Sequence, residues 1–407
     1  RFRRGEHVQK YAVQGYKGNM ATWNDYGKFV YALKAGRDQL PENIKKTVHD
    51  LTDGLKDPYE KVNVLYNFLQ KNSRYISVQL GIGGWQPYDA TYVATKRYGD
   101  CKALVNYMYS LLKEAGIPSN YTLVKSGESN TGILVDFPSQ QFNHVILSVP
   151  MAKDTIWLEC TSQDLPAGYL SGFTSDRQVL VVNENGGTLV STPRYGFKDN
   201  LQLRRISAEL RADGVLTADV RTFYQARQED DVHDMINALA RDKVLERLKQ
   251  RINLPNYDVL KFEYLEDKVA MPSITEKLSI TATDYAQVSG KRIFLTPNIL
   301  SRSEGKLTPE EKRKFDINIK FEYTDEDSVD IKIPEGFIPE ALPQNTELKS
   351  AFGSYKNSFK VEKDRIRYYR RIEKFSGRFP AADYPKLVEF NNQVYKADRA
   401  RIVLIKQ

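Results

Sequence analysis

The segment Arg97-Tyr98-Gly99-Asp100-Cys101-Lys102-Ala103 places one of only two cysteines in this chain directly before an amphipathic stretch. Apolar residues recur there at helical spacing until Gly116 and Pro118 end the pattern. Because an apolar helix face needs an apolar surface, the helix is expected to pack against a sheet. The pattern predicts that the first turn of this helix carries Cys101 and that its buried face consists of Leu104, Met108, Leu111, Leu112 and Ala115.

Cys101 is the candidate nucleophile of this segment. A thiol attacks a carbonyl as the thiolate, which a helix N-terminus and a nearby cationic base both stabilise. The flanking Gly99 and Asp100 and the position on the first turn indicate an accessible side chain. The alternative interpretation is an ordinary cysteine buried on a helix.

Two further blocks supply a candidate base and a candidate carboxylate. Phe142-Asn143-His144 opens a predicted strand, and Trp157-Leu158-Glu159-Cys160-Thr161 lies in the next one. A hairpin that closes through residues 150–153 would place His144 directly opposite Glu159 and on the same face. A carboxylate there can fix the tautomer of the imidazole, so we predict a triad of Cys101, His144 and Glu159. Otherwise, His144 is a hydrogen-bonded core residue and Glu159 a surface charge or half of an ion pair.

The oxyanion of a tetrahedral intermediate needs preorganised donors, and the backbone N–H of Cys101 is one. Gln86 and Trp85 lie in an irregular, glycine-containing loop upstream of the cysteine, and either side chain is a candidate for the second donor. An exposed loop glutamine and a packing tryptophan explain these two residues equally well.

The remaining cysteine and histidines indicate neither a disulfide framework nor a metal site. Strand alternation points Cys160 away from the face of Glu159, which predicts a small core residue. The two cysteines and four histidines lack spacings such as C-x-x-C or H-x-x-x-H, so neither a structural zinc nor another cofactor is expected. His7, His49 and His233 are interpreted as structural, with His233 on the surface.

Length, composition and charge restrict the class of protein. At 407 residues, of which 41% are hydrophobic and 11% aromatic, the chain is a multidomain globular protein rather than a disordered one. The net charge of +8 is the difference between 60 basic and 52 acidic residues spread along the chain. The densest basic run, from Lys363 to Lys374, alternates as an exposed strand would, which argues against a nucleic-acid partner. No apolar run approaches the roughly 18 residues of a membrane span.

The order of predicted elements indicates an α+β domain followed by a mainly-β domain. Helical patterns run from Trp23 to about Tyr75, and strands alternate from Leu201 onward, interrupted by one long helix from Glu229 to Ile252. The chain begins without Met or an apolar targeting core, so an upstream segment is expected to be missing. We therefore assign residues 1–19 to a remnant of an upstream domain or linker, 20–195 to a catalytic domain and 196–407 to a C-terminal β-rich domain.

In these blocks the chain resembles the transglutaminase-like superfamily of cysteine peptidases, because the cysteine, histidine and acidic blocks occur in the family order. The family more commonly has Asp where this chain has Glu159. From about Met20 to the C-terminus, the chain also resembles a multidomain type of bacterial envelope protein with β-rich domains before and after the transglutaminase-like one. The segments Phe352-Gly353-Ser354-Tyr355 and Gly377-Arg378-Phe379-Pro380 carry the resemblance to the last domain.

The resemblance implies a papain/transglutaminase-like core of helices packed on an antiparallel sheet, and a periplasmic or envelope location. The implied activity is thiolate attack on the amide carbonyl of a protein or peptide substrate, through a thioester acyl-enzyme. Two alternatives remain at this point. One is a true transglutaminase with an amine acceptor, and the other is an inactive scaffold that binds protein or glycan at the envelope. The sequence does not give the oligomeric state.

Overall fold

The computed structural model describes residues 10–78, 80–127, 132–310 and 313–407, and His7 lies outside them. The chain divides into two compact units, the first ending at Arg194 and the second beginning at Tyr195, with residues 268–271 grouped with the first. Each unit has its own apolar core. No helix in the described ranges is long and apolar enough to cross a membrane.

The first unit begins with a hairpin of strands β1 (Lys10–Val13) and β2 (Tyr16–Asn19). This hairpin covers the described part of the segment expected to be a remnant or linker. Tyr11, Val13 and Tyr16 pack against the core of the first unit, and the Tyr11 ring meets Phe29 edge-on at 4.8 Å. Residues 10–19 therefore pack as part of the first unit.

Five helices follow, and the last of them is the helix predicted to begin at Cys101. Thr22 caps the first helix through its side chain, and Asp57 caps the third, directly before Pro58 at its first position. The helices are α1 (Trp23–Lys34), α2 (Glu42–Thr52), α3 (Pro58–Asn72), α4 (Ala90–Lys96) and α5 (Cys101–Glu114).

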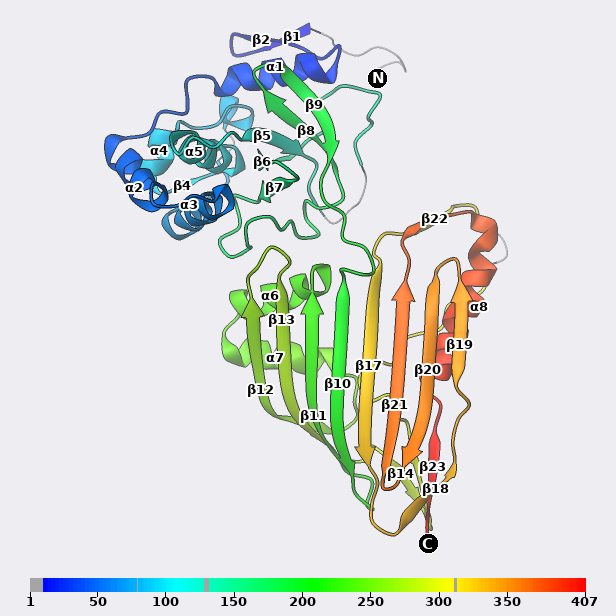
Figure 1. Ribbon diagram of the computed structural model, residues 1–407. Helices are drawn as coiled ribbons and strands as arrows, with labels where there is room; N and C mark the ends of the chain where they lie inside the picture. The colour runs from blue at the N-terminus through cyan, green and yellow to red at the C-terminus, as the bar shows by residue number, and fades with distance from the viewer. Residues whose placement is uncertain (1–9, 79, 128–131, 311–312) are drawn as a thin grey trace. The chain divides into compact units, whose positions relative to one another are not determined.

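The second half of the first unit forms a five-stranded antiparallel sheet. Its strand order is β7-β6-β5-β8-β9, and Figure 1 shows α2 to α5 grouped to one side of it. The backbones of α1 and β9 approach so closely that a Cβ on Gly27 would overlap the backbone of Gly187. The strands are β5 (Asn120–Val124), β6 (His144–Pro150), β7 (Thr155–Leu158), β8 (Gln178–Asn183) and β9 (Gly186–Ser191).

The register between β6 and β7 differs from the predicted one by two residues. Leu147 pairs with Leu158 and Pro150 with Thr155, so the hairpin closes through a loop shifted by one residue. His144 is therefore not directly opposite Glu159, which follows the end of β7. The predicted register was wrong, but a shift of two residues keeps the same face of the strand.

The second unit is built on an eight-stranded sheet of order β12-β13-β11-β10-β17-β21-β20-β19, in which only β10 and β17 run parallel. A four-stranded sheet and a two-stranded sheet complete the unit. The eight strands are β10 (Leu201–Leu210), β11 (Leu216–Gln225), β12 (Tyr257–Asp267), β13 (Ser273–Ala282), β17 (Tyr323–Lys332), β19 (Thr346–Ser350), β20 (Gly353–Glu362) and β21 (Arg365–Lys374).

Two predictions about the helices and strands of the second unit need correction, and one helix was missed. The expected long helix is two helices, α6 (Arg227–Ala238) and α7 (Arg241–Arg251), because Leu239 and Ala240 adopt extended backbone between them. The basic run ending at Lys374 forms β21, which is paired on both sides and not an exposed strand. A further helix, α8 (Tyr384–Ala397), was not predicted.

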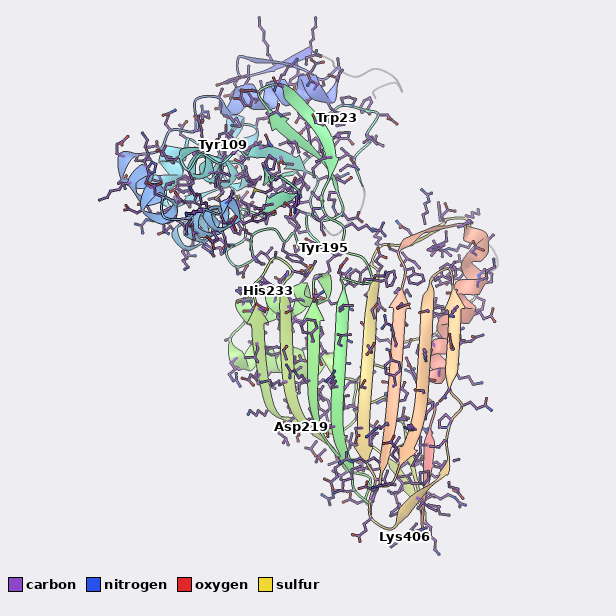
Figure 2. All side chains as sticks on the ribbon, viewed as in Figure 1. Trp23, Tyr109, Tyr195, Asp219, His233 and Lys406 are labelled. Carbon is purple, nitrogen blue, oxygen red and sulfur yellow. The ribbon has the colours of Figure 1, made fainter. Side chains whose placement is uncertain are left out.

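The third correction concerns His233, which is only 4% exposed rather than on the surface. It lies on α6 (Figure 2), where its Nδ1 is 2.9 Å from Glu266 Oε1 and 3.5 Å from Glu229 Oε1. Burial raises the pKa of Glu229 to about 7. Flanking aspartates in the sequence favoured a surface position, but the helix turns His233 toward the neighbouring strand β12.

Candidate active site

Cys101 is the first residue of α5, as the sequence predicts, and Asp100 caps the helix. The Asp100 carboxylate accepts a hydrogen bond from Ala103 N–H (2.9 Å) and pairs with the ammonium of Lys102. Gly99 is required here because a Cβ would lie 2.7 Å from that of Ala103. No acceptor among the described residues engages the N–H of Cys101, which leaves it as a donor for an oxyanion.

The Cys101 side chain is 4% exposed, which corrects the expectation of an accessible thiol. The sequence indicates the helix terminus but not the segments that cover it. Cys101 and His144 line the same cavity of about 220 Å³, together with Trp85. The thiol is therefore enclosed, with the imidazole beside it.

The structure brings His144 and Glu159 together. His144 Nε2 lies 3.0 Å from both carboxylate oxygens of Glu159, and the two residues are 8% and 5% exposed. Nε2 is thus engaged by the carboxylate, and Nδ1 remains for the Cys101 thiol, which lines the same cavity and contributes to the electrostatics of the imidazole. Thiol, imidazole and carboxylate therefore lie in one site.

The electrostatic balance favours a protonated imidazole. Burial by itself lowers the pKa of His144, but the Glu159 carboxylate and the hydrogen bonds to Cys101 and Glu159 outweigh it and raise the pKa to about 10. An imidazolium next to a thiol favours the thiolate, which is the nucleophilic form. The site therefore favours an imidazolium at His144, beside the candidate nucleophile.

Residues not singled out from the sequence hold the carboxylate in place. Thr161 donates to Glu159 Oε1 from both its hydroxyl (2.6 Å) and its backbone N–H (3.2 Å). Tyr66 on α3 donates its hydroxyl to the Glu159 carbonyl at 2.8 Å. The Phe173 ring meets the His144 ring edge-on at 5.4 Å. The adjacency of Thr161 to the acidic residue was the available sequence signal, since hydroxyls often bond a carboxylate two residues away.

Of the two candidate oxyanion residues, Trp85 lines the cavity and Gln86 does not. Gln86 is 7% exposed, and its amide nitrogen donates to the Tyr16 hydroxyl (2.9 Å) and the Leu33 carbonyl (3.0 Å). It does not line the cavity, so its place is structural. Trp85 does line the cavity, with its ring edge-on to Phe29 at 6.1 Å.

Gln140 is a polar cavity residue that the sequence did not suggest. Its side-chain oxygen accepts the Tyr26 hydroxyl hydrogen, and its nitrogen donates to the Phe142 carbonyl at 3.2 Å. Tyr121 lines the same cavity from β5. Gln140 precedes the histidine block on an irregular segment, and no sequence pattern distinguishes it from other loop glutamines.

Comparison with known families agrees with this geometry. Residues 45–164, which include Cys101, His144 and Glu159, match the family model of the transglutaminase-like superfamily. Residues 291–404 match a domain of unknown function with a solved structure, DUF3858. The chain thus contains a transglutaminase-like domain followed by a β-rich region. Comparison with curated proteins found no significant match.

The solved structures similar to this chain include the following two. A candidate protease from Parabacteroides distasonis aligns over 93% of this chain and 58% of its own, at 14% identity and a TM-score of 0.54. At that identity the likeness shows the fold alone, and the chain spans 58% of that neighbour's length. A candidate cysteine protease from Cytophaga hutchinsonii aligns over 39% of this chain and 44% of its own, at 18% identity and a TM-score of 0.25.

Proposed function

We propose that the first unit is a cysteine hydrolase that cleaves amide bonds in protein or peptide substrates, with Cys101 as the nucleophile. The observation that carries this proposal is the position of His144 between the Cys101 thiol and the Glu159 carboxylate. His144 serves as the base and acid, and Glu159 positions and charges it. The free N–H of Cys101 stabilises the oxyanion.

In the first step, the Cys101 thiolate attacks the carbonyl carbon, and the carbonyl electron pair moves onto oxygen. When this intermediate collapses, the C–N bond breaks and His144 gives its proton to the departing amine. The acyl group remains on sulfur as a thioester. Water then attacks the thioester and gives a proton to His144, the C–S bond breaks, and a carboxylic acid leaves with the thiolate regenerated.

The cavity of about 220 Å³ is smaller than typical drug-sized pockets of about 300–1,000 Å³. It therefore fits the reacting group of a substrate rather than several residues of it. An amine could take the place of water in the second step, which would make the enzyme a transglutaminase. The nature of the acceptor is thus an outcome of the test.

The test incubates the full chain with a defined peptide mixture in ¹⁸O-labelled water, with and without a fluorescent primary amine, and identifies products by mass spectrometry. Hydrolysis gives new carboxylates that carry ¹⁸O, whereas transamidation gives the amine adduct. Cys101→Ala should give neither product, and the matched control Cys160→Ala should retain the activity of wild type. A wild-type chain that yields neither product, or a Cys101→Ala variant that yields both as fast, would support a scaffold instead.

A further inference from the structure

One face of the eight-stranded sheet in the second unit changes from apolar to charged partway along its strands. On β10, Ile206 belongs to the apolar core, and Arg204, two residues earlier and therefore on the same face, does not. On β21, Tyr368 belongs to the core and Arg370 follows on the same face. If this face served only to pack against the covering helices, it would stay apolar along its whole length.

The change occurs along a single row of cross-strand neighbours that crosses six strands. Apart from Arg204, whose side chain is 10% exposed, every member is at most 3% exposed. Buried charges are costly unless paired, so such a row demands its own network of partners. The row consists of Glu276, Thr222, Arg204, Asp327, Arg370 and Asn357.

Hydrogen bonds fix the charged members of this row. Arg370 forms a two-pronged pair with Asp398, Nε to Oδ1 at 2.7 Å and Nη2 to Oδ2 at 3.1 Å. Arg204 donates to Thr222 Oγ1 (3.1 Å) and to Ser301 Oγ (2.5 Å). These side chains are therefore held rigidly before any ligand arrives, which lowers the entropy lost on binding.

The row borders a chamber of about 710 Å³ inside the second unit. Helix α7 lines the chamber at one end of the sheet and α8 at the other, and loop residues 300–307 lie along its side. Figure 1 shows the two helices behind opposite halves of the eight-stranded sheet. The volume lies within the usual range of about 300–1,000 Å³ for small-molecule sites.

The chamber contains cations that the network does not neutralise. Among the described residues, Lys374 and Arg302 both line it without a carboxylate within ion-pair distance. Burial lowers the pKa of Lys374, as expected for an ammonium without a counter-charge. Lys306 lies at the exposed rim, 5.4 Å from the centre of the Tyr395 ring. An anionic group would supply the missing counter-charge.

Asp325 indicates that the chamber is deep and yet accessible. Desolvation raises the pKa of its carboxyl to about 6, although Gln228 donates a hydrogen bond to it at 2.7 Å. The side chain nevertheless keeps part of its surface accessible, because it faces the chamber. A polar acceptor thus lies in the same chamber as the unpaired cations.

We propose that this chamber binds a small organic anion, through a phosphate or carboxylate group held by Lys374 and Arg302. The fixed row of Arg204 and Arg370 forms its floor, and Asp325 offers an acceptor for a hydroxyl or amine elsewhere on the ligand. This proposal does not depend on the chemistry at Cys101. Separate titrations with a phosphate probe and a carboxylate probe distinguish the two chemical classes of anionic group.

The test titrates the full chain with pyrophosphate and, separately, with citrate, by calorimetry at an ionic strength matched with sodium chloride. We expect saturable binding of at least one probe, and the one that binds identifies the class of anion. Lys374→Met should weaken that binding by at least about tenfold, since it removes a charge-assisted contact. Because it also removes an unpaired, half-buried charge, the variant should fold at least as stably as wild type.

The matched control is Lys349→Met, the same change on β19 at a side chain that is 80% exposed. It should bind the probe as wild type does. Saturable binding lost only in Lys374→Met supports the site. No saturable binding of either probe, equal binding by Lys374→Met, or equal losses in both variants would each overturn the proposal.

Discussion

The imidazole of His144 and the carboxylate of Glu159 meet at 3.0 Å although the two residues are not directly paired across the hairpin. The pairing of β6 and β7 has ended before either residue is reached, so Glu159 approaches the ring from the loop that follows β7. The Glu159 side chain, one methylene longer than that of Asp, spans the gap between this loop and the ring. The carboxylate is then held by Thr161 rather than by the sheet.

Replacing Glu159 tests this geometry. In Glu159→Gln, the neutral amide can contact the ring but cannot stabilise its positive charge, so we expect kcat/KM to fall by between about 10-fold and 10⁴-fold. Glu159→Asp should also lose activity, because the shorter side chain no longer spans the distance. Full activity in Glu159→Asp, measured on the substrate found with wild type, would show that reach is not the reason for Glu.

Thr161→Val removes the hydroxyl that donates to Glu159 Oε1 while it preserves the shape of the side chain. The backbone N–H of residue 161 still bonds the carboxylate, so we expect a loss of about 0.5–1.5 kcal/mol of transition-state stabilisation, or a few-fold in kcat with KM unchanged. Thr155→Val, at the start of β7, is the matched control. Equal kcat values in the two variants would remove Thr161 from the positioning network.

The raised pKa of His144 predicts a pH dependence of stability. A folded-state pKa of about 10, above the usual 6.5, means that the imidazolium contributes fully below pH 6.5 and that this contribution is lost as the pH rises through about 10. Wild type should therefore lose more unfolding free energy between pH 6 and pH 10 than His144→Gln, by urea denaturation. Parallel pH profiles for the two proteins would contradict a protonated, buried His144.

The close approach of α1 to β9 predicts a steric effect on stability. Gly27→Ala places a methyl group against the backbone of Gly187, so we expect the unfolding free energy to fall by about 1–3 kcal/mol. Gly54→Ala, where a Cβ would meet nothing within 4 Å, is the control and should be nearly neutral. Similar stabilities for the two variants would mean that α1 does not pack as described.

Local sequence signals were sufficient for the helix that begins at Cys101, because an apolar stripe and a terminal Gly116 and Pro118 all act within a few residues. The pairing of β6 with β7 was predicted in the wrong register, since its loop length depends on turn geometry that the sequence specifies weakly. The error was a shift of two residues, which keeps side chains on the same face of the strand. The predicted partner of His144 was therefore still the carboxylate that contacts it.

Long-range packing explains what the sequence did not reveal. The burial of Cys101 depends on segments distant in the chain, including Tyr26 and Phe142 along the same cavity. Gln86 donates a structural hydrogen bond to the Tyr16 hydroxyl, and no local sequence pattern indicates this contact. Likewise, the charged residues of β21 resemble those of an exposed strand. The sequence does not reveal that Arg370 is buried, because its partner Asp398 lies at the end of helix α8, distant in the chain.

The pH dependence of alkylation by iodoacetamide tests the central claim most directly. Cys101 should react readily well below pH 8.5 in wild type, while Cys160, whose thiol pKa is raised by burial, should lag behind it. The ratio of Cys101 alkylation rates at pH 6 and pH 9 should fall most in His144→Ala and less in Glu159→Gln, with folding checked by circular dichroism. Identical rate ratios in all three proteins, or Cys160 reacting as fast as Cys101, would contradict an activated thiolate at Cys101.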